Sequence, residues 1–295
     1  MPLQKLIFKP GINKEVTRYA AGNGWYDCDK VRFRFSLPEK IGGWARISGN
    51  TFQGVCRSLW AWITLTGAKL VGIGTHLKFY IELGGIYYDI TPIRATTTNA
   101  ATFAATDGST TITTTDNGHG AVIGDFVTFS SAASLGGVIT AVILNAEHQI
   151  VSVPTANTYT FTASIAANAS DSGNGGAATD AAYQISVGPE TVVPLIGFGA
   201  GKFGTGTFNV GSTSSVSLRQ WSQSNFGEDL VFGPRGGAPY YWDATNSVTT
   251  RGVALSSLGG ASNTPVVQNL VFVSDINRFV FCFGTNALGT TTQDP

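Results

Sequence analysis

The stretch Gly67-Ala-Lys-Leu-Val-Gly-Ile-Gly74, which runs through aromatic residues to Ile86-Tyr-Tyr-Asp-Ile-Thr-Pro92, recurs later in the chain. A second copy runs from Gly227-Glu-Asp-Leu-Val-Phe-Gly233 to Ala238-Pro-Tyr-Tyr-Trp-Asp243, and a third opens at Asn269-Leu-Val-Phe-Val273. The first two copies each join a short apolar run, a glycine turn and a run with paired tyrosines and an aspartate. Repeated antiparallel units of this kind predict an all-β scaffold of radially stacked sheets, like the blades of a β-propeller.

The composition fits strands and turns better than helices. Glycine is abundant, with 37 residues in 295, beside many threonines and serines. Only 12% of the residues are charged, and 18 basic and 18 acidic residues cancel. The balanced charge gives no global field that would attract nucleic acid or a membrane. Because a soluble surface usually carries more charge, we expect part of this one to be covered in an oligomer.

Residues 52–93 predict the first four-stranded blade, with strands at 55–62, 69–73, 77–83 and 86–90. Gly84-Gly85 between the last two strands predicts a tight hairpin with positive φ. A second blade is expected within 217–249, and a third from near Pro265. Because a closed propeller needs at least about four blades, further chain or neighbouring subunits must complete the ring, and we favour further chain.

The N-terminal 50 residues contain a strand with strict alternation, Val31-Arg-Phe-Arg-Phe35. Val31, Phe33 and Phe35 share one face, and Arg32 and Arg34 share the other. The following Pro38–Trp44 stretch predicts a turn that presents Trp44. The strand either enters the first sheet, which we favour, or belongs to an arm that docks on a neighbouring subunit.

A change of composition marks an inserted module at residues 95–184, followed by further blades in 185–295. Residues 95–182 are rich in Thr, Ala, Ser, Gly and Asn and contain no lysine or arginine. Alternating apolar residues predict strands at 110–114, 125–129, 138–144, 147–153 and 158–162, and residues 168–178 read as a flexible loop. Five short strands predict a small β-barrel or sandwich between blade 51–94 and the later blades.

No motif in the chain predicts catalysis, a metal site or a cofactor. The glycine-rich run at 197–208 departs from a phosphate-binding loop, since Phe203 follows Gly201-Lys202 where Ser or Thr is needed. The three histidines lack ligand-type spacing, and the three cysteines are expected to be buried free thiols. No apolar run approaches the roughly 20 residues that span a bilayer, so no membrane insertion is predicted.

Basic residues recur along the chain, and a ring of subunits could bring some of them to a pore lined for DNA phosphates. With zero net charge, solvated or inter-subunit ion pairs are the favoured alternative. The candidate subunit or DNA contacts are Lys30, Arg32, Arg34, Trp44 and Arg235.

Several stretches also resemble one family, the tail nozzle proteins of short-tailed bacteriophages, also called tail tubular protein B or packaged-DNA stabilisation protein. The resemblance rests on five strings in order: Lys30-Val-Arg-Phe-Arg-Phe-Ser-Leu-Pro-Glu-Lys-Ile-Gly-Gly-Trp44, Tyr87-Tyr-Asp-Ile-Thr-Pro-Ile93, the run at 197–208, Leu218-Arg-Gln-Trp-Ser-Gln-Ser-Asn-Phe-Gly-Glu-Asp-Leu230 and Pro234-Arg-Gly-Gly237.

This resemblance implies a virion tail protein, assembled in the host cytoplasm, that forms a hexameric ring on a β-propeller base. The ring would hang below the portal and the tail adaptor protein, contact tail fibres or spikes, and enclose a channel for packaged DNA. Members of the family are commonly longer than this chain. The family has no catalytic residues to carry over, and the sequence predicts no enzyme.

Two alternatives to a nozzle subunit start from particular side chains. A receptor- or carbohydrate-binding tail module would stack sugars on Trp60, Trp62, Trp221 or Trp242, although tryptophans within blades more often belong to the core. A glycan-cleaving enzyme would need two carboxylates beside a groove, for which Asp89 and Asp243 are the candidates. Their matching repeat positions favour a turn-closing role instead.

Overall fold

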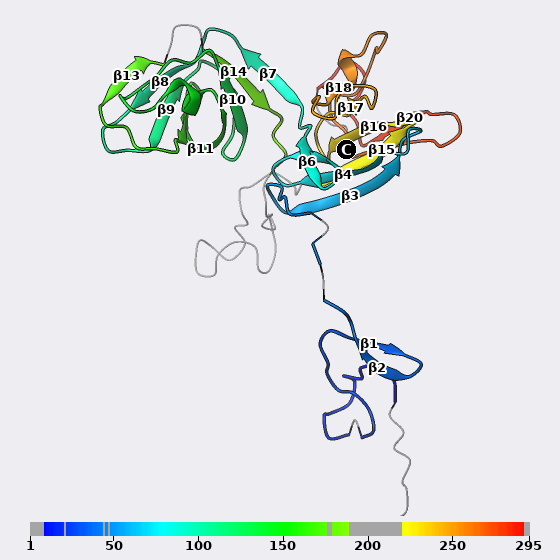
Figure 1. The fold of residues 1–295 in the computed structure, drawn as a ribbon. Helices are drawn as coiled ribbons and strands as arrows, with labels where there is room; N and C mark the ends of the chain where they lie inside the picture. Colours follow the sequence, from blue (N-terminus) through cyan, green and yellow to red (C-terminus); the bar gives the residue numbers. More distant parts are fainter. Residues whose placement is uncertain are drawn as a thin grey trace, which may run out of the picture. The chain divides into compact units, whose positions relative to one another are not determined.

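The computed structural model describes residues 9–20, 22–43, 45–46, 48–175, 179–188 and 220–291. This part contains twenty strands, one short α-helix and one 3-10 helix, which confirms the all-β prediction. The chain divides into two compact units, Met1–Gly49 and Asn50–Pro295 (Figure 1). Trp44 and the glycine-rich run at 197–208 lie outside the described residues.

The first unit is built on a two-stranded hairpin of β1 (Val31–Arg34) and β2 (Leu37–Lys40). Phe35 and Ser36 join the strands with positive φ values of 49° and 66°, as a two-residue hairpin turn requires. Two expectations are therefore wrong: Phe35 leaves the strand face, and the turn expected from Pro38 is strand β2. The hairpin is also a sheet of its own and does not enter the first blade.

The second unit opens with a four-stranded antiparallel sheet in chain order, which we call the first sheet. Its strands are β3 (Cys56–Ile63), β4 (Lys69–Thr75), β5 (Phe79–Leu83) and β6 (Ile86–Asp89). Gly84 and Gly85 join the last two strands with φ values of 61° and 87°. The four-stranded meander and its glycine hairpin are thus confirmed.

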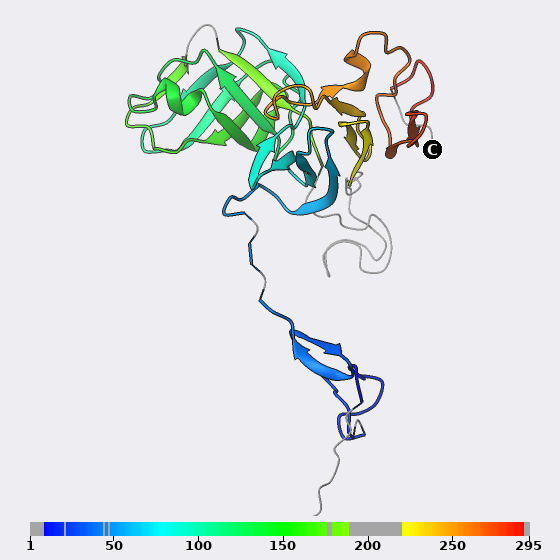
Figure 2. The same cartoon turned by 45° about the vertical axis from the view of Figure 1, so that its right-hand side comes forward.

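Two further sheets stack on the first in chain order (Figures 1 and 2). The second sheet has four strands and the third sheet has two, all antiparallel. A 3-10 helix, Leu255–Ser257, follows the second sheet. The strands are β15 (Trp221–Phe226), β16 (Asp229–Pro234), β17 (Tyr240–Trp242), β18 (Val253–Ala254), β19 (Leu270–Val273) and β20 (Val280–Phe283).

The period-two alternation of the second sheet explains why it can be covered on both faces. One face carries Phe232, whose ring lies 4.3 Å from that of Phe79 in the first sheet. The opposite face carries Val231, which packs against Val271 of the third sheet. On that same face Ser222 Oγ accepts a hydrogen bond from the Val271 N–H at 3.0 Å. Successive sheets therefore stack face to face, as propeller blades do.

The second halves of the two sequence copies lie on different strands of their sheets. Tyr87-Tyr88 lies on β6, the fourth strand of the first sheet, whereas Tyr240-Tyr241 lies on β17, the third strand of the second sheet. The strings match because both strands need aromatic residues on a half-buried surface. They do not mark equivalent places in the two sheets.

The inserted module is one eight-stranded sheet in the order β13-β8-β9-β12-β11-β10-β14-β7. The start of β11 pairs with β10 and its end pairs with β12, so this strand passes from one half of the sheet to the other. The order stays open, with β13 and β7 at its two ends, which is closer to the predicted sandwich than to a closed barrel. The elements are β7 (Ile93–Thr97), β8 (Thr102–Ala105), β9 (Thr111–Thr115), β10 (Phe126–Ser130), α1 (Ala141–Leu144), β11 (Glu147–Thr155), β12 (Thr158–Thr162), β13 (Asp171–Asn174) and β14 (Asp180–Gln184).

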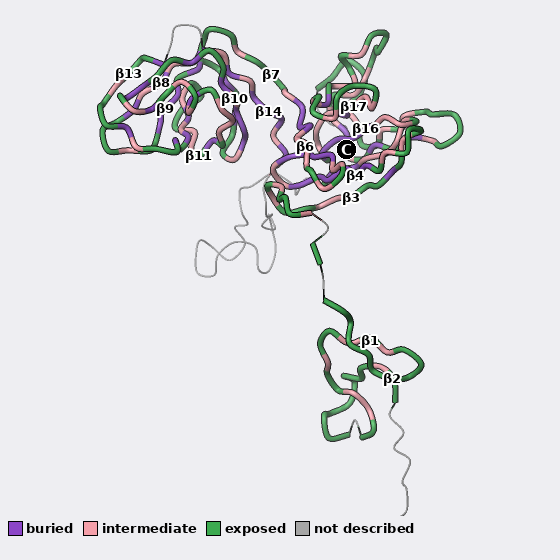
Figure 3. Tube along the Cα trace, viewed as in Figure 1, coloured by how far each residue is buried: buried purple, intermediate pink, exposed green. Residues whose placement is uncertain are grey.

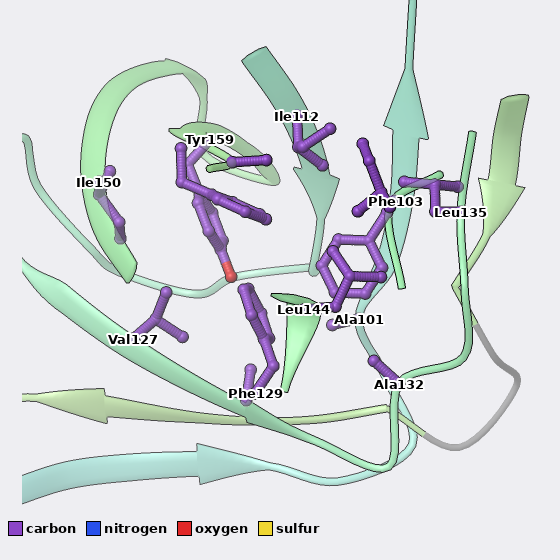
Figure 4. Close-up of a cluster of buried hydrophobic side chains, with 14 of the residues drawn as sticks. Ala101, Phe103, Ile112, Val127, Phe129, Ala132, Leu135, Leu144, Ile150 and Tyr159 are labelled. Atoms are coloured by element: carbon purple, nitrogen blue, oxygen red, sulfur yellow. The ribbon is translucent and has the colours of Figure 1, made fainter. Parts of the chain in front are cut away.

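The two halves of the module enclose a core of their own (Figures 3 and 4). Phe103 and Phe129, from opposite halves, meet edge to face with ring centres 4.9 Å apart. Two local predictions are wrong. The strand expected at 138–144 does not form: its second half, Ala141–Leu144, is α1, because a short apolar run fits a buried helix equally well. The loop expected at 168–178 contains β13.

Candidate functional site

The basic residues predicted from the N-terminal strand lie on the exposed hairpin of the first unit. Arg32 Nε lies 3.1 Å from Glu39 Oε2 across the two strands, and Lys30 Nζ lies 3.9 Å from Asp29 Oδ2. The Arg34 guanidinium lies over the Phe35 ring, 5.5 Å from its centre. Arg32 and Arg34 share one exposed face of β1, and surface ion pairs of this kind contribute little stability.

Arg235 belongs to the second unit, where it lies exposed in the turn after β16. Its backbone N–H donates to the carbonyl oxygen of Gln220 at 2.7 Å. The guanidinium takes no part in this hydrogen bond. The structure thus gathers Lys30, Arg32 and Arg34 on one hairpin and places Arg235 in the other unit. Their role as subunit or DNA contacts stays a prediction.

A buried charge cluster, which the sequence did not predict, lies where the inserted module meets the stacked sheets. Lys78, between β4 and β5, has a side chain only 4% exposed. Its Nζ lies 2.9 Å from Asp89 Oδ2, contacts Glu147 Oε1 of the module, and lies 4.3 Å from the centre of the Phe126 ring. A buried ammonium group needs such partners, because leaving it unpaired would cost several kcal/mol (roughly 3–5).

Arg251 completes this cluster, which we call the junction cluster: Lys78, Asp89, Glu147 and Arg251. The Arg251 NH2 group lies 3.3 Å from Asp89 Oδ2 and 3.4 Å from Glu147 Oε2. Its NH1 group donates to the Thr91 carbonyl oxygen at 2.7 Å. Two cations and two carboxylates therefore balance in a largely buried space, in which each carboxylate is shared by both cations.

The pKa of the Asp89 carboxyl shows the effect of the two cations in the junction cluster. Burial raises its pKa, but Lys78 and Arg251 outweigh burial and hold the pKa below its ordinary value. A carboxyl with a depressed native pKa stabilises the fold at neutral pH and loses that contribution as the pH falls through the native pKa. The contribution is fully present above the ordinary pKa of the unfolded chain.

We therefore expect the melting-temperature difference between the native protein and Asp89→Asn to shrink as the pH falls from about 5 to 3. At neutral pH the variant should melt lower, because Lys78 and Arg251 lose half of their compensating charge. Differential scanning fluorimetry across this pH range measures the effect. A difference that stays constant down to the lowest pH would contradict the role assigned to Asp89.

The two carboxylates considered for glycan cleavage close turns instead. Asp89 Oδ1 accepts the N–H of Thr91 at 2.9 Å, and Asp243 Oδ1 accepts the N–H of Thr245 at 2.8 Å. Both are i to i+2 turns of the kind that Asx residues favour. The turn-closing prediction is thus confirmed, although the two aspartates follow different strands of their sheets, and Asp89 also serves the junction cluster.

Three of the four tryptophans considered for sugar stacking belong to the core. Trp62, Trp221 and Trp242 are buried between the first and second sheets. Their indole N–H groups all donate to backbone carbonyl oxygens. Trp60 remains partly exposed, at 41%, with its Nε1 donating to Asn225 Oδ1 at 2.5 Å. The expectation that tryptophans within blades belong to the core is confirmed for these three rings, and sugar stacking stays a prediction for Trp60 alone.

The outer face of the third sheet is apolar and exposed. Phe272, Phe281 and Phe283 stack across β19 and β20, with ring centres 5.0 and 5.6 Å apart. These rings and Leu270 are between 39% and 51% exposed. Four large apolar side chains on one small sheet form a contiguous patch, which is typical of an interaction surface.

The outer face of the first sheet is also apolar along β3. Leu59 and Ile63 are 65% and 64% exposed, with Ala61 exposed between them. The alternate residues Trp60 and Trp62 point to the second sheet, so both faces of this strand carry apolar side chains. The stack of three sheets thus exposes apolar side chains on the outer face of the third sheet and along the edge strand β3 of the first sheet, whereas Ile73 and Tyr80 on that same face of the first sheet are buried.

Within the described ranges, no group of three or more His, Cys, Asp or Glu side chains could hold a metal ion. Nor does that part of the chain contain a helix long and apolar enough to cross a membrane. Of the three free cysteines, Cys56 is exposed and Cys28 and Cys282 are half-buried, so the expectation of buried thiols is wrong for Cys56. Burial raises the pKa of the Cys282 thiol.

Comparisons with known proteins leave the family open. No protein family and no curated protein matches the sequence. Among solved structures, phage phi92 endosialidase aligns with 75% of this chain and 31% of its own, at 17% identity and a TM-score of 0.27. The chain therefore spans about a third of that structure, and a likeness of this size carries no argument about fold or function.

Proposed function

We propose that this chain is a structural subunit of a bacteriophage tail, within the ring-shaped nozzle that retains the packaged genome and forms the channel for its ejection. In this role the stacked sheets are a rigid wall and the chain assembles with further copies of itself, a tail adaptor and tail fibres or spikes. The candidate contacts to neighbouring subunits or DNA are Lys30, Arg32, Arg34, Trp44 and Arg235.

The observation that carries the proposal is the exposed apolar side chains at the two ends of the stacked sheets, along β3 of the first sheet and on the outer face of the third sheet. Apolar side chains are exposed at both ends of the stack: Leu59 and Ile63 at one end, and Phe272, Phe281 and Phe283 at the other. Exposed apolar patches of this kind are typical of surfaces that a partner covers. A contact between two different patches on identical subunits forms a ring where the rotation between neighbours closes, and an open filament where it does not. The order of the sequence strings described above supports a nozzle as the assembly.

The first test is the size of the purified full chain in solution. Light scattering coupled to size-exclusion chromatography should give an oligomer, and negative-stain electron microscopy should show rings. An isolated monomer at tens of micromolar, which also fails to form rings in the presence of DNA, would contradict the proposal.

Charged substitutions on the outer faces should disrupt this assembly. We expect Phe281→Lys and Ile63→Lys to shift the particle to smaller oligomers, because each places an ammonium group inside a covered apolar surface. Val142→Lys is the matched control, since Val142 is 82% exposed in α1 of the inserted module. An assembly that responds equally to all three variants would show that the outer faces are not its contacts.

A further inference from the structure

The inserted module is joined to the stacked sheets by two paired strands. Strand β7 leads into the module and β14 leads out, and they pair with each other up to Ile93 and Gln184. Just outside the module, the Ile185 N–H donates to the Pro92 carbonyl oxygen at 3.0 Å. Strand β10 pairs with β14 as far as Tyr183, so beyond that residue only two paired segments continue as a narrow ribbon, and two strands by themselves are marginally stable.

Among the residues that the structure describes, no cluster of buried apolar side chains spans this connection. The core of the module and the core between the first and second sheets form two separate clusters of buried side chains. Ile185 and Val187, which follow the ribbon, belong to the core of the sheets. Apolar burial therefore stabilises each body by itself, and their mutual orientation depends on other contacts.

Those contacts converge on one carboxylate, that of Glu147 at the start of β11. It receives Lys78 from the first sheet, Arg251 from the segment before β18, and Gln184 at the end of the ribbon. Phe126 adds its ring beneath the Lys78 ammonium group. Glu147 is the only glutamate in residues 95–182, which contain no lysine or arginine, and its two ionic partners, Lys78 and Arg251, come from outside the module.

We propose that Glu147 is a latch that holds the inserted module in one orientation on the stacked sheets, with the paired strands near Ile93 and Gln184 as the hinge. Neutralising this side chain leaves Lys78 and Arg251 facing Asp89 alone, so one positive charge in a largely buried space loses its partner. When the module separates from the stacked sheets, that charge becomes exposed to water. The module then swings on the hinge with its own core intact.

Hydrogen exchange on the purified full chain tests this latch, whatever its state of assembly. In Glu147→Gln we expect the amides of residues 75–79, 126–128 and 147–149 to exchange about tenfold faster or more, because opening the junction exposes them. Strands β9 and β12 in the module core, and β16 in the second sheet, should keep their native protection. Glu39→Gln is the control, since it removes only the exposed pair with Arg32.

The pattern of exchange separates a latch from a general loss of stability. Faster exchange in β9 or β12 to the same degree as at the junction would overturn the proposal, as would no change at the junction. Arg251→Gln, which leaves the contact between Lys78 and Glu147 in place, should give a smaller local increase. An intact mass lower by one water, from an amide between Lys78 and a carboxylate, would also overturn a reversible latch.

Discussion

Replacing Phe232 with alanine is expected to lower the free energy of unfolding of the Asn50–Pro295 unit by about 3–5 kcal/mol. The ring is fully buried between the first two sheets, stacked on Phe79 at 4.3 Å and 6.1 Å from Trp221. On its other side Gly252 lies so close that a Cβ there would come within 2.6 Å of the ring. Neighbours held this tightly cannot collapse into the space left by the ring.

Urea unfolding followed by tryptophan fluorescence measures this loss, because Trp62, Trp221 and Trp242 all lie in the affected core. Residues 95–182 contain no tryptophan, so the inserted module does not contribute to the signal. Phe279→Ala makes the same chemical change at a side chain that is 61% exposed, and should cost less than about 1 kcal/mol. Equal losses in the two variants would contradict the assignment of Phe232 to the core.

The sequence predicted the sheets well where one face of a strand is apolar and the next strand follows at once. The first sheet follows from the apolar runs at 69–73 and 77–83 and from Gly84-Gly85, because local alternation and turn chemistry decide both pairing and register. The same signals failed where a run is short. Residues 138–144 could form a strand or a helix, and only the surrounding core of the module decides for α1.

The junction cluster could not be found from spacing, because its members come from three distant segments of the chain. Lys78 and Asp89 lie at the two ends of the β5–β6 hairpin, whereas Glu147 and Arg251 are brought in by the packing of the module and the second sheet. One signal was present. Residues 95–182 offer no lysine or arginine to Glu147, and a largely buried carboxylate needs a cationic partner.

Stacking of the first two sheets also depends on Gly74, and Gly74→Ala is expected to cost about 3 kcal/mol by overpacking. A Cβ at this position would lie 2.4 Å from Trp221 Cδ1 and 2.6 Å from Ser58 Oγ. The indole cannot move aside freely, because its Nε1 donates to the Thr75 carbonyl oxygen at 2.7 Å and its ring contacts Phe79 at 4.9 Å. The two sheets must therefore separate slightly or lose these contacts.

Two further glycines make this a graded series. A Cβ at Gly72 would meet the end of the Gln223 side chain, which can rotate away, so Gly72→Ala should cost less than Gly74→Ala. Gly259 has open space around it and should accept alanine within about 0.5 kcal/mol. Urea unfolding by tryptophan fluorescence should rank the losses as Gly74, then Gly72, then Gly259. Equal stability of Gly74→Ala and Gly259→Ala would mean that the first two sheets do not stack through Trp221, and the scaffold proposed for the tail would lose its central contact.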